Sequence, residues 1–295
     1  MKISETPVEE LKLPWLADFG VELYVKREDL NNPDISGNKL HKLKYNLEEA
    51  KHQGLNTLLT FGGAYSNHIY ATAAAGKAYG FKTIGIIRGE EHLPLNETLQ
   101  FATNNGMEIQ YLDRTRYRLK NSALVLNELK RKFGEYFLIP EGGTNELAIK
   151  GCMEILKENE KDFSHCCLSV GTGGTLAGII QGFKGQSKII GFSALKGEFL
   201  EVEVNSLFRQ FNMPEFDNWQ INNDYHFGGY AKVNDQLIEF VKENETTYGL
   251  PLEPIYTAKA LYGILDLVRK GQFVKGSKIL FIHTGGLQGR AGFGL

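Results

Sequence analysis

Cysteine is scarce in this chain, and its placement excludes two kinds of stabilising site. Three cysteines occur in 295 residues, at Cys152, Cys166 and Cys167. An odd number that includes an adjacent pair is unsuited to a disulfide framework or to a metal-ligand set. We therefore expect a reduced, cytoplasmic protein without a bound metal.

Long apolar runs and blocks of like charge are also missing. The N-terminal stretch has no apolar core of signal-peptide length, and no segment approaches the roughly 20 apolar residues of a membrane span. The 33 basic and 35 acidic residues nearly cancel, and no cluster of one sign suggests a nucleic-acid surface. These features predict a soluble protein whose partner is neither a membrane nor a nucleic acid.

The chain does contain an alternation of short apolar runs and helical patterns. Helical patterns cover 38–52, 66–79, 145–158 and 235–246. The apolar runs mostly lack polar alternation, as strands do when helices cover both faces of a parallel sheet. These predicted strands are residues 57–61, 82–88, 107–112, 136–139, 166–170, 188–194 and 278–284. The alternation predicts an α/β fold with right-handed crossovers.

Glycine-rich loops follow four of the predicted strands. They are GGAYSNH (62–68), PEGGTN (140–145), GTGGTLAG (171–178) and TGGLQG (284–289). Loops at the carboxyl ends of parallel strands collect ligands, so the four loops together predict one polar small-molecule site. The alternative is that the turns of an α/β protein need glycine for conformation alone.

The third loop has the composition of a phosphate cradle. Small residues between a strand and a helix let backbone N–H groups approach an anion, and the helix N-terminus adds a favourable dipole. No Gly-Lys-Ser/Thr follows, so the loop is not a P-loop. Its spacing is loosely similar to a dinucleotide-binding pattern, which leaves a nucleotide-dependent enzyme as an alternative.

Two further stretches carry residue types that chemistry uses. In DISGNKLHKL (34–43) a glycine turn precedes Lys39, and a lysine becomes a nucleophile or base where its pKa is depressed. Lys42 and Lys44 are predicted to be ordinary lysines of a solvated helix face. Ser66 is a helix N-cap residue type that can also grip a carboxylate, while His68 is predicted to be a packed or surface histidine.

Several of these motifs, taken in order, resemble one family. KREDLNNPDISGNKLHKL, GGAYSNH, GTGGTLAG, PIYTAKALYG and FIHTGGLQG are similar to motifs of the 1-aminocyclopropane-1-carboxylate deaminase and D-cysteine desulfhydrase family. The resemblance implies a pyridoxal 5′-phosphate cofactor and a tryptophan-synthase-β-like fold of two mostly parallel α/β domains with the cofactor in the cleft. It also implies a large domain (1–46 plus 126–295), a small inserted domain (47–125) and a homodimer.

The resemblance assigns roles to residues of this chain. Lys39 would form the Schiff base with the cofactor and move the α-proton. Ser66 matches a residue near the substrate carboxylate, Asn67 the neighbour of the pyridoxal O3′, and Tyr230 and Tyr256 two catalytic tyrosines. The remaining expected cofactor contacts are Gly171, Thr172, Gly173, Gly174 and Thr175 at the phosphate, with Thr257 and Thr284 near the pyridine nitrogen.

The resemblance also bears on the reaction. Members similar to true deaminases have glutamate at the position of Thr257, and a hydroxyl there favours β-elimination from a small amino acid, giving a 2-oxo acid and ammonia. Opening of a cyclopropane ring remains the alternative reaction. Tyr65 and Tyr70 replace the glutamine and arginine usual in the family, so a non-catalytic protein that binds the cofactor or an amino acid is a further alternative.

Overall fold

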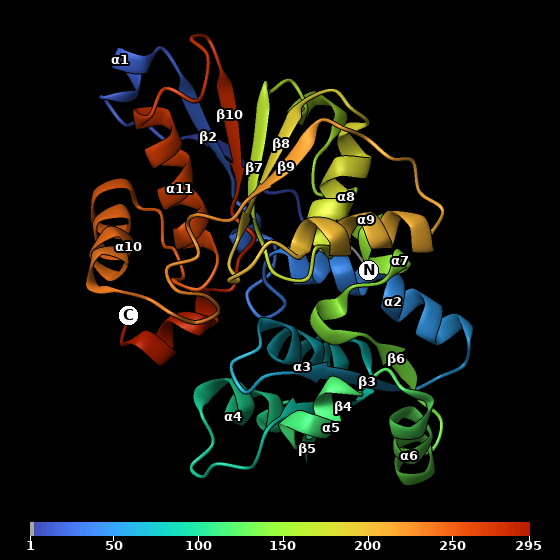
Figure 1. The fold of residues 1–295 in the computed structure, drawn as a ribbon. Helices are drawn as coiled ribbons and strands as arrows, with labels where there is room; N and C mark the ends of the chain where they lie inside the picture. Colours follow the sequence, from blue (N-terminus) through green and yellow to red (C-terminus); the bar gives the residue numbers. More distant parts are fainter. Residues whose placement is uncertain (1–2) are drawn as a thin grey trace.

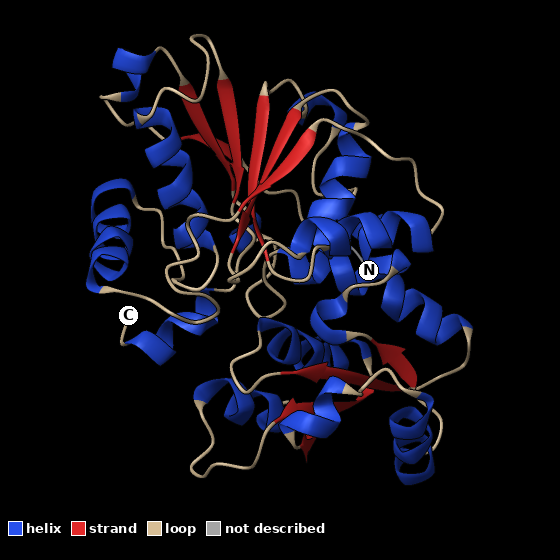
Figure 2. Cartoon of the chain, in the orientation of Figure 1, coloured by secondary structure: helices blue, strands red, loops and turns tan. Residues whose placement is uncertain are grey.

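The chain folds around two separate sheets that lie one above the other in Figure 1. The structure is a computed structural model, and it describes residues 3–295. The larger sheet has the strand order β1-β2-β10-β7-β8-β9, and the smaller has β5-β4-β3-β6. Only the pairing of β1 with β2 is antiparallel among these strands. The predicted α/β class with mostly parallel sheets is confirmed (Figure 2).

The bounds of the elements are as follows. The strands are β1 (Val8–Glu10), β2 (Glu22–Lys26), β3 (Thr57–Gly62), β4 (Lys82–Arg88), β5 (Met107–Leu112), β6 (Phe137–Ile139), β7 (His165–Val170), β8 (Lys188–Ser193), β9 (Trp219–Asn222) and β10 (Lys278–Ile282). The helices are α1 (Leu16–Phe19), α2 (Asn38–His52), α3 (Asn67–Tyr79), α4 (Glu97–Asn104), α5 (Arg114–Arg118), α6 (Ala123–Phe133), α7 (Glu146–Cys152), α8 (Gly174–Phe183), α9 (Leu200–Gln210), α10 (Asp235–Tyr248) and α11 (Thr257–Arg269). Short 3₁₀ segments are η1 (Glu28–Leu30), η2 (Glu141–Gly143), η3 (Glu158–Glu160) and η4 (Leu287–Phe293).

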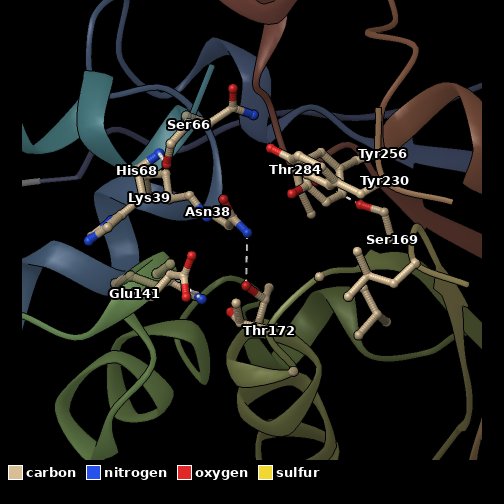
Figure 3. A pocket seen from close by; sticks show the side chains of 18 of the residues that line it. Asn38, Lys39, Ser66, His68, Glu141, Ser169, Thr172, Tyr230, Tyr256 and Thr284 are labelled. Atoms are coloured by element: carbon tan, nitrogen blue, oxygen red, sulfur yellow. Dashed lines mark hydrogen bonds between the residues drawn. The ribbon is translucent and has the colours of Figure 1, made fainter. Parts of the chain in front are cut away.

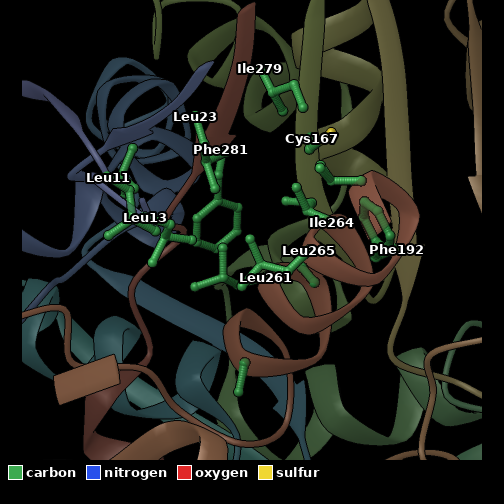
Figure 4. Packing of buried hydrophobic residues seen from close by; sticks show 14 of the residues in the cluster. Leu11, Leu13, Leu23, Cys167, Phe192, Leu261, Ile264, Leu265, Ile279 and Phe281 are labelled. Carbon is green, nitrogen blue, oxygen red and sulfur yellow. The ribbon is translucent and has the colours of Figure 1, made fainter. Parts of the chain in front are cut away.

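Helices cover both faces of the larger sheet, which explains its uninterrupted apolar strands. Alternate residues of β10 point to opposite faces. Ile279 and Phe281 pack with α10 and α11, whereas Leu280 and Ile282 pack with α8 and α9. Figure 4 shows the first of these layers, with Phe281 against Leu261 of α11. Residues 279–282 of β10 are all buried, so no polar alternation develops there.

The structure corrects the end of one predicted helix and adds three strands. Residue 47 lies inside α2 and residue 125 inside α6, and the division into a large domain and a small domain of 47–125 stays a prediction. The smaller sheet runs from Thr57 to Ile139, because β6 pairs with β3. The helix predicted over 145–158 ends at Cys152, and β1, β2 and β9 were not predicted.

Helix α2 joins the two halves and begins under a steric constraint. Gly37 precedes the helix with φ 72°, and a Cβ atom on it would lie 1.9 Å from the carbonyl oxygen of Thr284. The N–H of Asn38 donates to that same oxygen at 3.1 Å. The start of α2 is therefore held against the loop after β10, and only glycine permits the approach.

No described helix, in the part of the chain from residue 3 onward, has the length and apolar character needed to cross a membrane. The three cysteines are unpaired and buried.

Substitution of Gly37 by alanine tests the constraint at the start of α2. We expect Gly37→Ala to lower the free energy of unfolding by about 3 kcal/mol, because the new Cβ overlaps rigid backbone. Gly54→Ala is the matched control: its φ is also positive, at 69°, but nothing lies within 4 Å of the added atom. The control should lose about 1 kcal/mol. Equal losses in a denaturant titration would contradict the steric account.

Candidate active site

One cavity of about 350 Å³ lies where the carboxyl ends of strands from both sheets meet. All four glycine-rich loops predicted from the sequence contribute to its wall, as do the start of α2 and the end of β4. In Figure 3, Lys39, Ser66 and His68 lie on one side, and Tyr230, Tyr256 and Thr284 lie opposite. The lining residues are Asn38, Lys39, Lys42, Gly63, Ser66, Asn67, His68, Arg88, Glu141, Gly142, Ser169, Val170, Gly171, Thr172, Gly173, Thr175, Leu176, Leu195, Tyr230, Tyr256, Thr284 and Gly285.

Lys39 projects from the first turn of α2 into this cavity, where it is partly buried. Burial, together with the positive charge of Lys42, lowers the pKa of Lys39 to about 7. No described side chain forms an ion pair or hydrogen bond with the Lys39 amine. Lys39 is therefore the cavity's available neutral amine near pH 7, which is the property required of a nucleophile or base.

Lys42 is not the solvated helix-face lysine that the sequence predicted. Its exposed fraction is 2%, and Nζ donates to the carbonyl of Gly142 at 2.9 Å and to Oγ1 of Thr144 at 3.1 Å. Burial lowers the pKa of Lys42 to about 8. Lys44 fits its prediction better, because it is partly exposed and pairs with Glu154 at 2.5 Å.

In the loop between β7 and α8, neighbouring side chains fill the space that a Cβ would need at two glycine positions. A Cβ on Gly173, whose φ is 78°, would meet Val204 at 2.8 Å. A Cβ on Gly174 would lie 2.8 Å from Thr144 and 3.2 Å from Nζ of Lys42. The backbone N–H groups at the start of α8 are thus accessible beside a buried ammonium, which is a strong combination for an anion.

The start of α3 forms a second place for an anion. Ser66 caps the helix, its Oγ accepting from the N–H groups of His68 at 3.2 Å and Ile69 at 3.3 Å. The Ser66 hydroxyl hydrogen remains to be donated. Asn67 lies beside it, and its Oδ1 accepts from Nε2 of Gln288. Both the capping role and the binding role considered for Ser66 are therefore compatible with its position.

His68 is packed, in agreement with the sequence prediction. The hydroxyl of Thr60 donates to the carbonyl of Ile139 at 2.8 Å, so the 2.8 Å contact between Thr60 Oγ1 and His68 Nε2 requires the histidine N–H as donor. Burial and the two nearby lysines hold the pKa of His68 well below its usual range. A neutral His68 leaves Nδ1 as an acceptor without a partner among the described residues.

The opposite wall consists of two tyrosines and a threonine. The rings of Tyr230 and Tyr256 meet edge to face with centroids 6.2 Å apart, and burial raises the pKa of both hydroxyls. Thr284 Oγ1 and Ser169 Oγ lie 3.1 Å apart. The tyrosines therefore keep their hydroxyl protons at neutral pH and can donate them.

Two of the expected cofactor residues do not line the cavity. Thr257 is fully buried, and its hydroxyl exchanges hydrogen bonds with the backbone of Glu253, accepting from the N–H at 3.0 Å and donating to the carbonyl at 3.2 Å. Gly174 is not among the lining residues, and a Cβ on it would lie 2.8 Å from Oγ1 of Thr144. Of the two hydroxyls expected near the pyridine nitrogen, the structure brings only Thr284 to the cavity.

Sequence reasoning missed four polar residues of the wall: Asn38, Arg88, Glu141 and Ser169. Arg88 ends β4 and Glu141 follows β6 by two residues. The rule that strand ends collect ligands selected the loop that contains Glu141 without singling out this residue, and it could also have found Arg88. Glu141 accepts from the hydroxyl of Tyr117 at 2.8 Å and pairs with Lys120 at 3.1 Å. Asn38 and Ser169 carry no comparable sequence signal.

The residues present fit pyridoxal phosphate. The glycine loop and Lys42 can hold the phosphate, Asn67 and Thr284 offer polar contacts for the ring, and Lys39 offers the amine. The fit requires glycine in the loop, because a Cβ on Gly171 would lie 3.1 Å from the Tyr256 ring. Among the described residues, no group of histidine, cysteine or carboxylate side chains is arranged to hold a metal.

Acylation of Lys39 tests its altered acidity. In the cofactor-free protein, labelling of Lys39 should rise with pH about a midpoint near 7, because the ammonium is unreactive and the amine predominates above the pKa. Ordinary exposed lysines, which titrate near 10.4, are the internal control. Lys42→Met should move the midpoint upward by removing a neighbouring positive charge. Mass spectrometry of labelled peptides measures both; a Lys39 midpoint matching the exposed lysines would refute the assignment.

Comparison with known proteins agrees with this geometry. The family model described as pyridoxal-phosphate dependent enzyme matches residues 1–285. A Pyrococcus horikoshii protein provisionally named a 1-aminocyclopropane-1-carboxylate deaminase is 33% identical over 306 residues, covering 98% of this chain and 92% of that protein. The Arabidopsis thaliana mitochondrial bifunctional D-cysteine desulfhydrase/1-aminocyclopropane-1-carboxylate deaminase is 32% identical, covering 96% and 77%.

A solved structure extends the similarity to the fold. The crystal structure of a 1-aminocyclopropane-1-carboxylate deaminase homologue superposes with a TM-score of 0.85 at 31% identity, covering 99% of this chain and 92% of the other. The family match, the relatives and the fitted cavity agree, and the chain belongs to the pyridoxal-phosphate dependent enzymes.

Proposed function

We propose that this protein is a pyridoxal-phosphate-dependent deaminating lyase that eliminates the β-substituent of a small amino acid, releasing a 2-oxo acid and ammonia. The observation that carries the proposal is Lys39, an amine with a pKa of about 7 that faces a cavity between two helix N-termini. The cofactor, when bound, supplies an electron sink for the carbanion that forms at the α-carbon.

The chain's own residues would bind, orient and move protons around that centre. The glycine loop and Lys42 hold the phosphate, which fixes the cofactor ring between the two walls. The N-terminus of α3 and the Ser66 hydroxyl bind the substrate carboxylate. Lys39 then takes the α-proton as a neutral amine, and a tyrosine hydroxyl on the opposite wall donates a proton to the departing group.

The lining favours β-elimination over ring opening. Among the described residues that line the cavity, Glu141 is the only carboxylate, and it is already engaged by Tyr117 and Lys120. The side of the cavity near Thr284 offers hydroxyls instead, which do not hold a pyridine nitrogen protonated as a carboxylate does. A weaker electron sink suits loss of a good β leaving group better than cleavage of a carbon–carbon bond.

Ring opening of 1-aminocyclopropane-1-carboxylate is the second candidate. The names of two relatives favour this reaction. The Pyrococcus horikoshii protein is provisionally named a deaminase, and the Arabidopsis thaliana enzyme is named for both activities. Tyr230 and Tyr256, which face each other across 6.2 Å between ring centroids, could assist either reaction as proton donors.

We also propose that the working protein is a homodimer in the reducing cytoplasm. The assembly follows from the family resemblance. The compartment is supported by the three unpaired cysteines, for which burial raises the pKa and so disfavours the reactive thiolate. Light scattering of the purified protein measures the assembly directly.

A substrate panel tests the proposed function. Purified protein loaded with pyridoxal phosphate should release ammonia and a 2-oxo acid from D-cysteine, L-cysteine or D-serine, faster than from 1-aminocyclopropane-1-carboxylate. Lys39→Ala should lower the rate by at least about 1,000-fold, because it removes both the covalent anchor and the base. It should also abolish the absorbance band of bound cofactor.

Lys44→Ala is the matched control, since Lys44 lies on the same helix and pairs with Glu154 at the surface. It should keep the band and the rate. Release from the cyclopropane substrate alone would establish ring opening in place of β-elimination. If the protein binds the cofactor but forms no product from any of these substrates, it is a binding protein and not a lyase.

A further inference from the structure

The loop that carries Tyr230 into the cavity has few buried residues. Between Tyr225 and Asn234, only Tyr225 and Gly229 are buried. The loop contains a run of residues in the left-handed region, with φ 51° at Phe227, 95° at Gly228, 117° at Gly229 and 53° at Ala231. At Phe227 and Ala231, which are not glycine, such backbone persists only where its surroundings hold it in place.

Two turns in this loop direct their carbonyls to one point. The N–H of Gly229 donates to the carbonyl of His226 at 3.0 Å, and the N–H of Lys232 donates to the carbonyl of Gly229 at 3.1 Å. The same two carbonyls also accept from Nζ of Lys259, at 2.8 Å and 2.9 Å respectively. A single ammonium is thus hydrogen-bonded to the carbonyl oxygens of both turns.

Lys259 is an unusual residue in this position. It lies in α11 with an exposed fraction of 1%, and no described carboxylate forms an ion pair with it. Burial lowers the pKa of Lys259 to about 8, opposed by the charge of Glu253. A buried cation without a paired anion is costly, and here the two loop carbonyls are the hydrogen-bond partners of the ammonium among the described residues.

The same helix also positions the second tyrosine. The Glu253 carboxylate accepts from the N–H groups of Ile255, Tyr256 and Thr257 at 2.6–2.8 Å, which secures the first turn of α11. Tyr256 is the N-cap residue of α11, and Lys259 lies in the first turn of the same helix. One helix therefore holds Tyr256 through its backbone and the Tyr230 loop through Lys259.

We propose that Lys259 is a positioning residue: an internal ammonium that binds the carbonyls of His226 and Gly229 and so fixes Tyr230 against Tyr256 at the cavity. Its effect on turnover depends on the proposed function. Its effect on the order of the loop does not.

Chemical rescue tests the role of the ammonium. Lys259→Ala removes a fragment that matches n-propylammonium. Hydrogen exchange at the amides of 228–232 should accelerate about 10- to 100-fold in this variant, the range expected for losing hydrogen bonds from a charged donor in a buried site. Added n-propylammonium should restore slow exchange, whereas n-propanol, with the same stem and no charge, should not. In the cofactor-loaded enzyme, kcat should fall and recover in parallel.

Lys242→Ala is the matched control, because Lys242 is an exposed lysine of the neighbouring helix α10. Its loop exchange should equal that of the wild type with or without amine. If Lys259→Ala does not fold, Lys259→Met, which keeps the stem and lacks the charge, carries the same exchange measurement without rescue.

Unchanged exchange in Lys259→Ala or Lys259→Met, or recovery with propanol as well as propylammonium, would overturn the inference. So would a loss of kcat with unchanged loop exchange. If the wild type acts on no amino acid, the proposed function fails, yet the exchange and rescue measurements still decide the role of Lys259.

Discussion

The active site depends on the close approach of two backbones, at Gly37 and Thr284. The carbonyl of Thr284 occupies the space where any other residue at position 37 would have its Cβ, and it accepts the first N–H of α2. This contact fixes the first turn of α2 against the end of β10. Lys39 follows one residue later, so its amine enters the cavity that the strands of both sheets surround. The glycine turn before Lys39 is thus a steric requirement rather than a flexible joint.

The electrostatics of the cavity follow from that placement. Two lysines from one helix, Lys39 and Lys42, line the cavity without an ion pair to any described carboxylate, and burial lowers both pKa values. The hydrogen bonds of Lys42 beside the glycine loop offset part of the free-energy cost of burying its ammonium, and an anion bound at that loop would offset more of it. Lys39 has no such partner among the described residues, and its pKa of about 7 makes the neutral amine available at neutral pH. The same neighbourhood keeps His68 neutral. A phosphate at the glycine loop and a reactive amine at Lys39 are therefore complementary parts of one charge arrangement.

The sequence predicted much of this site because its signals are local. Glycine-rich turns after apolar strands mark the carboxyl ends of parallel strands, and all four reach the cavity. Lys42 could not be assigned in the same way: helical periodicity places it on the polar face of α2, and only the tertiary packing of η2 and the glycine loop covers that face. The pairing of β6 with β3 was equally hidden from local signals, because the two strands are far apart in the chain. Thr257 was expected at the cofactor from the resemblance alone, whereas its hydroxyl serves the first turn of α11.

The central claim is that Lys39, rather than its buried neighbour Lys42, is the amine that holds the cofactor. Borohydride reduction of the cofactor-loaded protein, followed by mass mapping of its peptides, tests this most directly. The account predicts one pyridoxyl group per chain, attached to Lys39. A pyridoxyl group on Lys42 or on any other lysine, or no attached group at saturating cofactor, would contradict it.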